Sequence, residues 1–238
     1  RRIAEHIASL QWSDTVRVES DARTALAGAH ADNAGIIVIA GTGSMVLGMG
    51  PAGECIRAGG WGGLVGDEGS GYDSGLRAIK AALAFVDGCG RETILVETLR
   101  RDLKIDSWSE IVPGVYGGAI DRSRIAALTP SVLAAAEAGD QVAEDLVRCA
   151  GVELSARIAA VARRLSLGSS FPLAYSGGVA SGAGRLRMAI EVALGEEGLQ
   201  VEMNPVRLPP VLGAVLLGWK HMGCIIDANM IKNLGKTA

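Results

Sequence analysis

Residues 35–44 read GIIVIAGTGS, a β-branched apolar run that passes directly into a turn of small residues. The continuous run over residues 35–40 is typical of a strand that is buried on both faces of a sheet. Residues 44–47 and 54–58 have the composition of its hairpin partners, with the turn at residues 50–53. The segment therefore predicts a buried strand that ends in a glycine-containing turn.

Helices and further strands are expected to alternate on either side of this segment, and such alternation indicates α/β architecture. Further strands are predicted over residues 15–19, 171–175 and 199–202. Helices are predicted over residues 3–10, 22–30, 71–86, 91–103, 109–116, 124–138, 142–164, 184–194 and 210–220.

The composition excludes several classes of function. The 238 residues carry a net charge of −3, without the clustered basic surface that a nucleic-acid partner requires. The longest apolar runs are too short to span a bilayer, so no membrane partner is expected. The four cysteines, Cys55, Cys89, Cys149 and Cys224, are far apart and form no metal-binding spacing. We interpret them as reduced thiols in a cytoplasmic protein.

A second informative stretch, Gly59–Gly75, reads GGWGGLVGDEGSGYDSG and contains eight glycines. Each glycine lowers helix stability by roughly 1 kcal/mol relative to alanine, so this density indicates a backbone that must approach something closely. A flexible linker has no use for a buried indole, so Trp61 argues against a plain loop. Asp67 and Glu68 can cap the following helix, accept hydrogen bonds from a ligand, or do both. An indole and acids beside bare backbone suit a polyhydroxylated ligand such as a sugar.

Three shorter features have both a structural and a functional interpretation. The turn at residues 41–44 is either a hairpin turn or a phosphate-binding loop. The turn at residues 176–179, between a strand and a helix, is either a simple connection or a nucleotide site. Asp21 either caps a helix or accepts a proton from a substrate hydroxyl. The histidines His6, His30 and His221 lack sequence partners and are interpreted as structural or surface residues.

The order of these segments carries a resemblance to a known family. Asp21-Ala22, GTGS at 41–44, GGWGGLVGDEGSGY at 59–72 and SGGVA at 176–180 resemble the N-acetylglucosamine kinase branch of the sugar kinase/heat-shock chaperone/actin superfamily. This branch is grouped with the BadF/BcrA-type ATPases. The resemblance implies a ribonuclease H-like (actin-like ATPase) lobe, with a mixed sheet flanked by helices. It also implies ATP and Mg²⁺, an amino-sugar substrate phosphorylated on its 6-hydroxyl, and a possible homodimer.

The resemblance also assigns roles to individual residues. Asp21 is implied as the general base that takes the proton from the sugar hydroxyl. The implied nucleotide-binding residues are Thr42, Gly43, Gly177, Gly178, Ser181 and Gly182, with Ala126 and Ala127 near the adenine. The implied sugar-binding residues are Gly60, Trp61, Gly62 and Asp67.

One departure from the family pattern affects the expected domains. The family begins with a strand pair that carries a phosphate motif of the DGGGT kind, and this motif is absent here. Residues 1–30 are therefore expected to be a remnant of the first lobe, and residues 31–220 the second lobe. Residues 221–238 are expected to form a helix that packs toward the first lobe. The chain is expected to be a fragment of a longer protein.

Two other functions remain open on the sequence. One is an activator-type ATPase of the same family, in which cysteines hold an iron–sulfur cluster between subunits; the scattered cysteines argue against it. The other is a non-catalytic sugar-binding protein, which the missing first motif favours.

Overall fold

The computed structural model describes residues 2–10, 15–179, 184–203 and 206–236. Its strands are β1 (Gly35–Ala40), β2 (Ser44–Met49), β3 (Cys55–Gly59), β4 (Ser170–Ser176) and β5 (Gln200–Met203). Its longer helices are α1 (Arg2–Ser9), α2 (Asp21–His30), α3 (Gly71–Val86), α4 (Leu95–Leu103), α7 (Thr129–Glu137), α8 (Gln141–Arg164), α10 (Gly184–Glu196), α11 (Pro210–His221) and α12 (Ala228–Gly235). Shorter ones are η1 (Trp108–Glu110), α5 (Ile111–Tyr116) and α6 (Arg122–Ala126).

The five strands form one mixed sheet in the order β3-β2-β1-β4-β5. The hairpins β1–β2 and β2–β3 are antiparallel, whereas β4 is parallel to both β1 and β5. The predicted central strand is therefore confirmed, and so is the mixed sheet of a ribonuclease H-like lobe.

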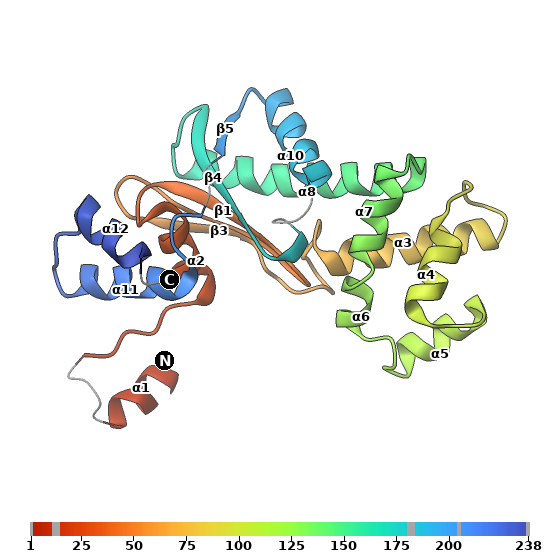
Figure 1. The fold of residues 1–238 in the computed structure, drawn as a ribbon, viewed down its shortest axis with the longest axis horizontal. Coiled ribbons are helices and arrows are strands. Elements are labelled where there is room, and N and C mark those ends of the chain that lie inside the picture. The colour runs from red at the N-terminus through yellow and green to blue at the C-terminus, as the bar shows by residue number, and fades with distance from the viewer. Residues whose placement is uncertain (1, 11–14, 180–183, 204–205, 237–238) are drawn as a thin grey trace.

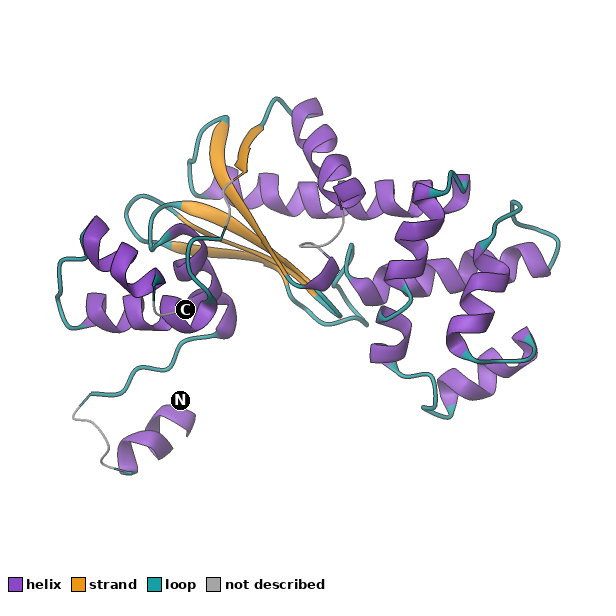
Figure 2. Cartoon of the chain, viewed as in Figure 1, coloured by secondary structure: helices purple, strands orange, loops and turns teal. Residues whose placement is uncertain are grey.

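Helices cover both faces of this sheet, as Figures 1 and 2 show. Side chains alternate along β1, so Ile36 and Val38 join the large core beneath α8. Ile37 points the other way and packs against Ala25 and Leu26 of α2. The helices α3 to α7 form a group beyond one end of the sheet (Figure 1). This group and the strand ends enclose the site described below.

Helix α2 belongs to the packing of the sheet, although it falls within the predicted remnant of the first lobe. Its outer face contacts α11, because Gly213 of α11 lies against the backbone of Thr24 and Gly28. Helix α12 follows α11. Its Ile231 and Leu234 pack against a small core that contains Leu208 and, from α11, Leu216. The predicted boundaries at residues 30/31 and 220/221 stay predictions.

Two expected elements differ in kind or number from the structure, and the helix expected over residues 91–103 begins only at Leu95. Residues 15–20 form no strand, because an alternating segment needs a partner backbone and no described strand pairs with it. The helix expected over residues 124–138 is two helices, α6 and α7. Pro130, the second residue of α7, has no N–H and favours a helix start, which explains the break before it.

No helix in the described ranges is both long and apolar enough to cross a bilayer.

His30 is a buried structural residue, as interpreted from the sequence. It ends α2, and its Nε2 lies 2.8 Å from the carbonyl oxygen of Ile36. Gly35 leaves room for the ring, since a Cβ there would lie 2.9 Å from it. Burial is the main cause that lowers the pKa of His30 below its ordinary value of 6.5.

The free energy of unfolding is expected to fall as the pH drops below about 6.5, because the unfolded state then binds a proton that folded His30 resists. Above that pH the stabilisation is fully present. The slope cannot exceed about 1.4 kcal/mol per pH unit for one proton. Urea unfolding between pH 7.5 and 5.5 measures it. His30→Gln should flatten the profile, whereas His6→Gln, at an exposed position, should leave the slope unchanged. An unchanged slope in His30→Gln would contradict the assignment.

Candidate functional site

The turn after β1 is built from Gly41, Thr42 and Gly43. The Gly41 N–H donates to the Gly43 carbonyl at 2.9 Å. The carbonyls of Gly41 and Thr42 accept the N–H groups of Gly71 (2.8 Å) and Tyr72 (3.3 Å), at the start of α3. Within the described residues, the N–H groups of Thr42 and Gly43 donate to no protein acceptor. Two free amides on a fixed turn suit an anion.

The turn after β4 lies directly beside it. β4 is the parallel neighbour of β1, and Ile39 pairs with Ser176. Gly177 has φ of +91°, and a Cβ there would lie 2.5 Å from the carbonyl oxygen of Ala40. Only glycine permits this approach of the two strand ends. Ser181 and Gly182, also predicted to bind nucleotide, lie outside the described residues.

A groove of about 410 Å³ joins these two turns to α6 and α7. Its volume is in the range of small-molecule sites. Gly41, Thr42 and Gly178 form the turn side, and hydroxyl groups and small apolar side chains form the other walls. The remaining lining residues are Ser123, Ala126, Ala127, Thr129, Pro130, Leu133 and Val179. Four residues that the sequence implied for the nucleotide therefore line one groove: Thr42, Ala126, Ala127 and Gly178. Gly41, next to Thr42, lines it as well.

The Gly59–Gly66 segment leaves the sheet at the end of β3. Gly59, Gly60 and Gly62 all have φ between +73° and +88°, so the segment is a tight series of turns. The expectation of a buried indole is wrong, because Trp61 is 68% exposed. The guanidinium of Arg57, from β3, lies over the ring at 5.0 Å from its centroid. Trp61 is therefore a surface residue, with most of its indole open to solvent, and not a core residue.

Asp67 lies beneath this segment and is only 4% exposed. Its φ of +61° is in the left-handed region, which aspartate tolerates better than most residues. Its Oδ2 forms an ion pair with Nη2 of Arg122, the first residue of α6. A Cβ on Gly43 would lie 2.7 Å from the same Oδ2, so the carboxylate packs directly against the phosphate-type turn.

Glu68 is held by an arginine from a different helix. Its carboxylate pairs with Arg157 of α8, and its backbone carbonyl accepts the Ser44 hydroxyl at 2.8 Å. The helix cap next to it is Ser70, whose Oγ accepts the Asp73 N–H at 3.2 Å. The two acids therefore position the turn, and neither is the N-cap of α3.

Sequence reasoning missed Arg122 and Arg157. They lie 55 and 89 residues from their acidic partners. A buried acid such as Asp67 does call for a cation, but the sequence offers many arginines and does not say which one reaches it or the neighbouring Glu68.

Asp21 is the first residue of α2, and its side chain is exposed. Ser20 caps the helix, with Oγ accepting the Arg23 N–H at 3.2 Å. The Asp21 carboxylate accepts the N–H of Ala22 at 2.8 Å. In the part of the chain that is described, no hydrogen bond or ion pair links Asp21 to the turns at residues 41–43 or 60–68.

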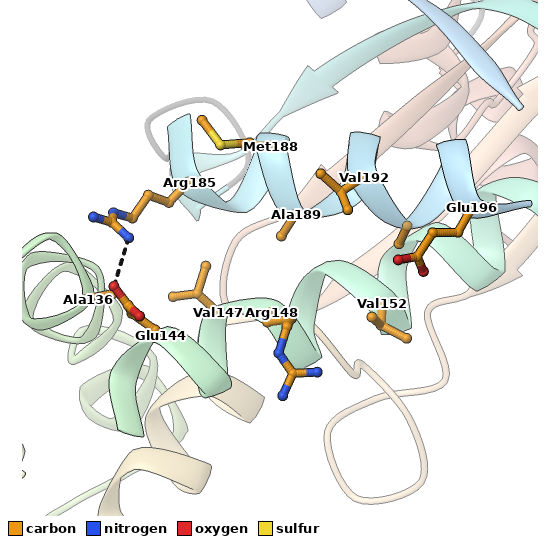
Figure 3. Close-up of a pocket in the computed structure, with 11 residues that line it drawn as sticks. Ala136, Glu144, Val147, Arg148, Val152, Arg185, Met188, Ala189, Val192 and Glu196 are labelled. Carbon is orange, nitrogen blue, oxygen red and sulfur yellow. Dashed lines mark hydrogen bonds and ion pairs between the residues drawn. The ribbon is translucent and has the colours of Figure 1, made fainter. Parts of the chain in front are cut away.

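A separate surface groove of about 380 Å³ runs between α8 and α10 (Figure 3). Its floor is apolar, from Val147, Val152 and Val192, and an ion pair of 3.3 Å between Arg185 and Glu144 closes one end. It contains none of the site residues predicted from the sequence.

The cysteines are all free and lie on separate elements, and three of them are exposed: Cys55, Cys89 and Cys224. The described residues include no cluster of three or more His, Cys, Asp or Glu side chains suited to a metal ion.

The mixed sheet with two adjoining strand-end turns defines one lobe of a ribonuclease H-like, actin-like ATPase. Residues 2–218 match the sequence model of the BadF/BadG/BcrA/BcrD ATPase family, and the chain belongs to that family. It is 36% identical over 216 residues to the N-acetylmuramic acid/N-acetylglucosamine kinase of Clostridium acetobutylicum, covering 90% of this chain and 71% of that protein. It is 30% identical over 204 residues to the N-acetyl-D-glucosamine kinase of Dictyostelium discoideum, covering 84% of this chain and 64% of that protein.

Solved structures agree with this family. A putative N-acetylglucosamine kinase from Chromobacterium violaceum superposes with a TM-score of 0.67 at 30% identity, over 90% of this chain and 70% of that one. A putative N-acetylglucosamine kinase from Porphyromonas gingivalis has a TM-score of 0.65 at 22% identity, over 92% and 72%, and supports the fold alone.

Proposed function

We propose that the chain is part of a kinase that transfers a phosphoryl group from ATP to the 6-hydroxyl of an amino sugar, N-acetylglucosamine or glucosamine. The observation that carries this proposal is the groove joining the Thr42 turn, Gly178 and the alanines at the end of α6, Ala126 and Ala127, beside the buried Asp67. Membership of an ATPase family supports ATP as the nucleotide. The names of the relatives support an amino sugar as the acceptor.

The nucleotide would lie along this groove. The small apolar walls at Ala126, Ala127 and Val179 suit a flat base, and the free amides of Thr42 and Gly43 suit phosphate oxygens. Mg²⁺ prefers oxygen ligands and retains waters, so it would be held mainly by the phosphates. When bound, it neutralises charge on the transferred group.

The sugar would lie against the Gly60–Gly62 backbone. Positive φ angles turn this backbone outward without side chains, and the exposed Trp61 ring offers an apolar face beside it. Asp67 would accept a hydrogen bond from a sugar hydroxyl through Oδ1, since Oδ2 is paired with Arg122.

Asp21 would orient and deprotonate the attacking hydroxyl. Its exposed carboxylate has no cation partner among the described residues, so it is free to accept a proton. Phosphoryl transfer depends chiefly on positioning and charge neutralisation, and the two turns would supply the positioning.

A panel of sugars in a coupled ADP-release assay with the full-length protein tests the proposal. We expect release with N-acetylglucosamine or glucosamine, and none above background with 6-deoxy-N-acetylglucosamine. Release that continues with the 6-deoxy sugar would contradict the 6-hydroxyl. Sugar binding by calorimetry without ADP release would instead favour the non-catalytic sugar-binding protein.

We also propose that the protein is a homodimer that uses the groove between α8 and α10. Met188 and Val192 are 63% and 58% exposed there, and side chains of opposite charge, Arg148 and Glu196, line the same groove. Two copies related by a twofold axis can pair such charges while covering the apolar floor. The molar mass from light scattering tests the dimer, and a monomer at micromolar concentration would contradict it.

A further inference from the structure

The helix α6 has two faces with different neighbours. Ser123 and Ala126, together with Ala127 just after the helix, lie on the groove that we assign to the nucleotide. Arg122, at the start of the same helix, pairs with the buried Asp67 that we assign to the sugar. One short element therefore contacts both halves of the site.

Arg122 is held by more than this ion pair. Its guanidinium lies 5.2 Å from the centroid of the Tyr72 ring, an arrangement that favours a cation. A Cβ on Gly63 would lie 3.0 Å from the guanidinium carbon, so the Gly59–Gly66 segment packs against it too. Arg122 thus contacts the loop on the sugar side, the start of α3 and the acid.

The five residues of α6 are too few to form a stable helix alone, so tertiary contacts fix its position. Gly75 of α3 is one such contact, because a Cβ there would lie 2.0 Å from the Ile125 carbonyl oxygen. Arg124 points elsewhere: it donates hydrogen bonds of 2.7 Å to the carbonyls of Ala119 and Leu103, neither of which lines the nucleotide groove. Among these contacts, the Arg122–Asp67 pair is the one that joins α6 to the turn at Gly43.

We propose that Arg122 is a positioning residue through which the nucleotide groove depends on Asp67. The pair holds the α6 wall at a fixed distance from the Thr42–Gly43 turn, because its carboxylate packs on Gly43. Removing either partner leaves the other charge buried or unpaired and releases this wall. Asp67 then contributes to nucleotide affinity although it does not line the groove. This inference rests on the proposed function.

A double-mutant cycle with ADP binding as the readout tests the coupling. Calorimetry with Mg-ADP and no sugar compares the unchanged chain with Arg122→Met, Asp67→Asn and the double variant. We expect each single variant to weaken ADP binding by about tenfold, and the double variant by about the same factor, because residues in one network act non-additively. Arg122→Lys keeps the charge but loses the planar fork, and it should recover part of the loss.

Arg124→Met is the matched control on the same helix. It loses two hydrogen bonds to backbone carbonyls, so it should lower the unfolding midpoint while keeping ADP affinity within about twofold. Circular dichroism establishes that every variant is folded before its affinity is compared. A merely structural role of Arg122 predicts that Arg124→Met and Arg122→Met weaken ADP equally, which would overturn the coupling.

The outcomes separate this inference from the proposed function. If the unchanged chain binds ADP tightly and the single variants bind it with the same affinity, the coupling is overturned and the proposed nucleotide groove stands. Single effects that add in the double variant would also overturn it. No ADP binding by the unchanged chain would contradict the proposed nucleotide groove, and the coupling would fall with it.

Discussion

Replacing Asp21 with asparagine is expected to lower turnover by a factor of about 10²–10⁴ while sugar affinity stays close to its original value. Asparagine keeps the shape of the side chain but cannot take up the hydroxyl proton. Because Ser20 is the N-cap, helix α2 keeps its capping hydrogen bond in this variant. The steady-state rate of ADP release measures turnover, and calorimetry measures sugar affinity separately.

Asp227→Asn is the matched control for this prediction. Asp227 also begins a helix, where Oδ1 accepts the Met230 N–H at 2.8 Å, and asparagine caps equally well. That variant should turn over normally. Near-normal turnover in Asp21→Asn would show that another group accepts the proton.

Replacing Gly177 with alanine is expected to weaken ADP binding at least about tenfold and to lower the free energy of unfolding by about 1–3 kcal/mol. The new Cβ would collide with the Ala40 carbonyl at 2.5 Å, in a backbone region that alanine rarely adopts. Relief of the collision requires the ends of β1 and β4 to separate, which widens the groove between their turns. Calorimetry with ADP and urea unfolding measure the two effects.

Gly168→Ala separates backbone strain from collision. Gly168 has φ of +77°, but no atom lies within 4 Å of its ideal Cβ, and it is outside the groove. We expect a stability loss of about 1 kcal/mol and unchanged ADP affinity. If Gly177→Ala binds ADP as well as Gly168→Ala does, the close approach of the two turns is not needed for the nucleotide.

The sequence was most informative where local patterns decide the structure. The β1 run and the bounds of α3, Gly71–Val86, follow from apolar periodicity and from the glycines before the helix. The strand expected over residues 15–19 failed because pairing depends on a distant partner that the alternation does not reveal. The expectation that Trp61 is buried was wrong for a related reason, since the burial of an indole depends on distant residues that the local sequence does not reveal.

The candidate site divides in the same way. Glycine turns at strand ends are visible in the sequence, and the structure places Thr42 and Gly178 in one groove. The arginines that pair with Asp67 and Glu68 cannot be identified from the sequence, because they lie 55 and 89 residues away and no local pattern links them to these acids. The roles of Asp21 and Asp67 remain predictions that the experiments above address.

The parallel pairing of β1 with β4 has a consequence for how the molecule folds. Ile36 meets Leu173 only after the chain has closed around the whole helical segment between them. Such distant closure is slow relative to hairpin formation, so we expect the β1–β2–β3 hairpins to form early and the junction of β1 and β4 late. A molecule bound between the turns of these two strands would bind only the closed form, and by mass action it would hold together the contact that forms last.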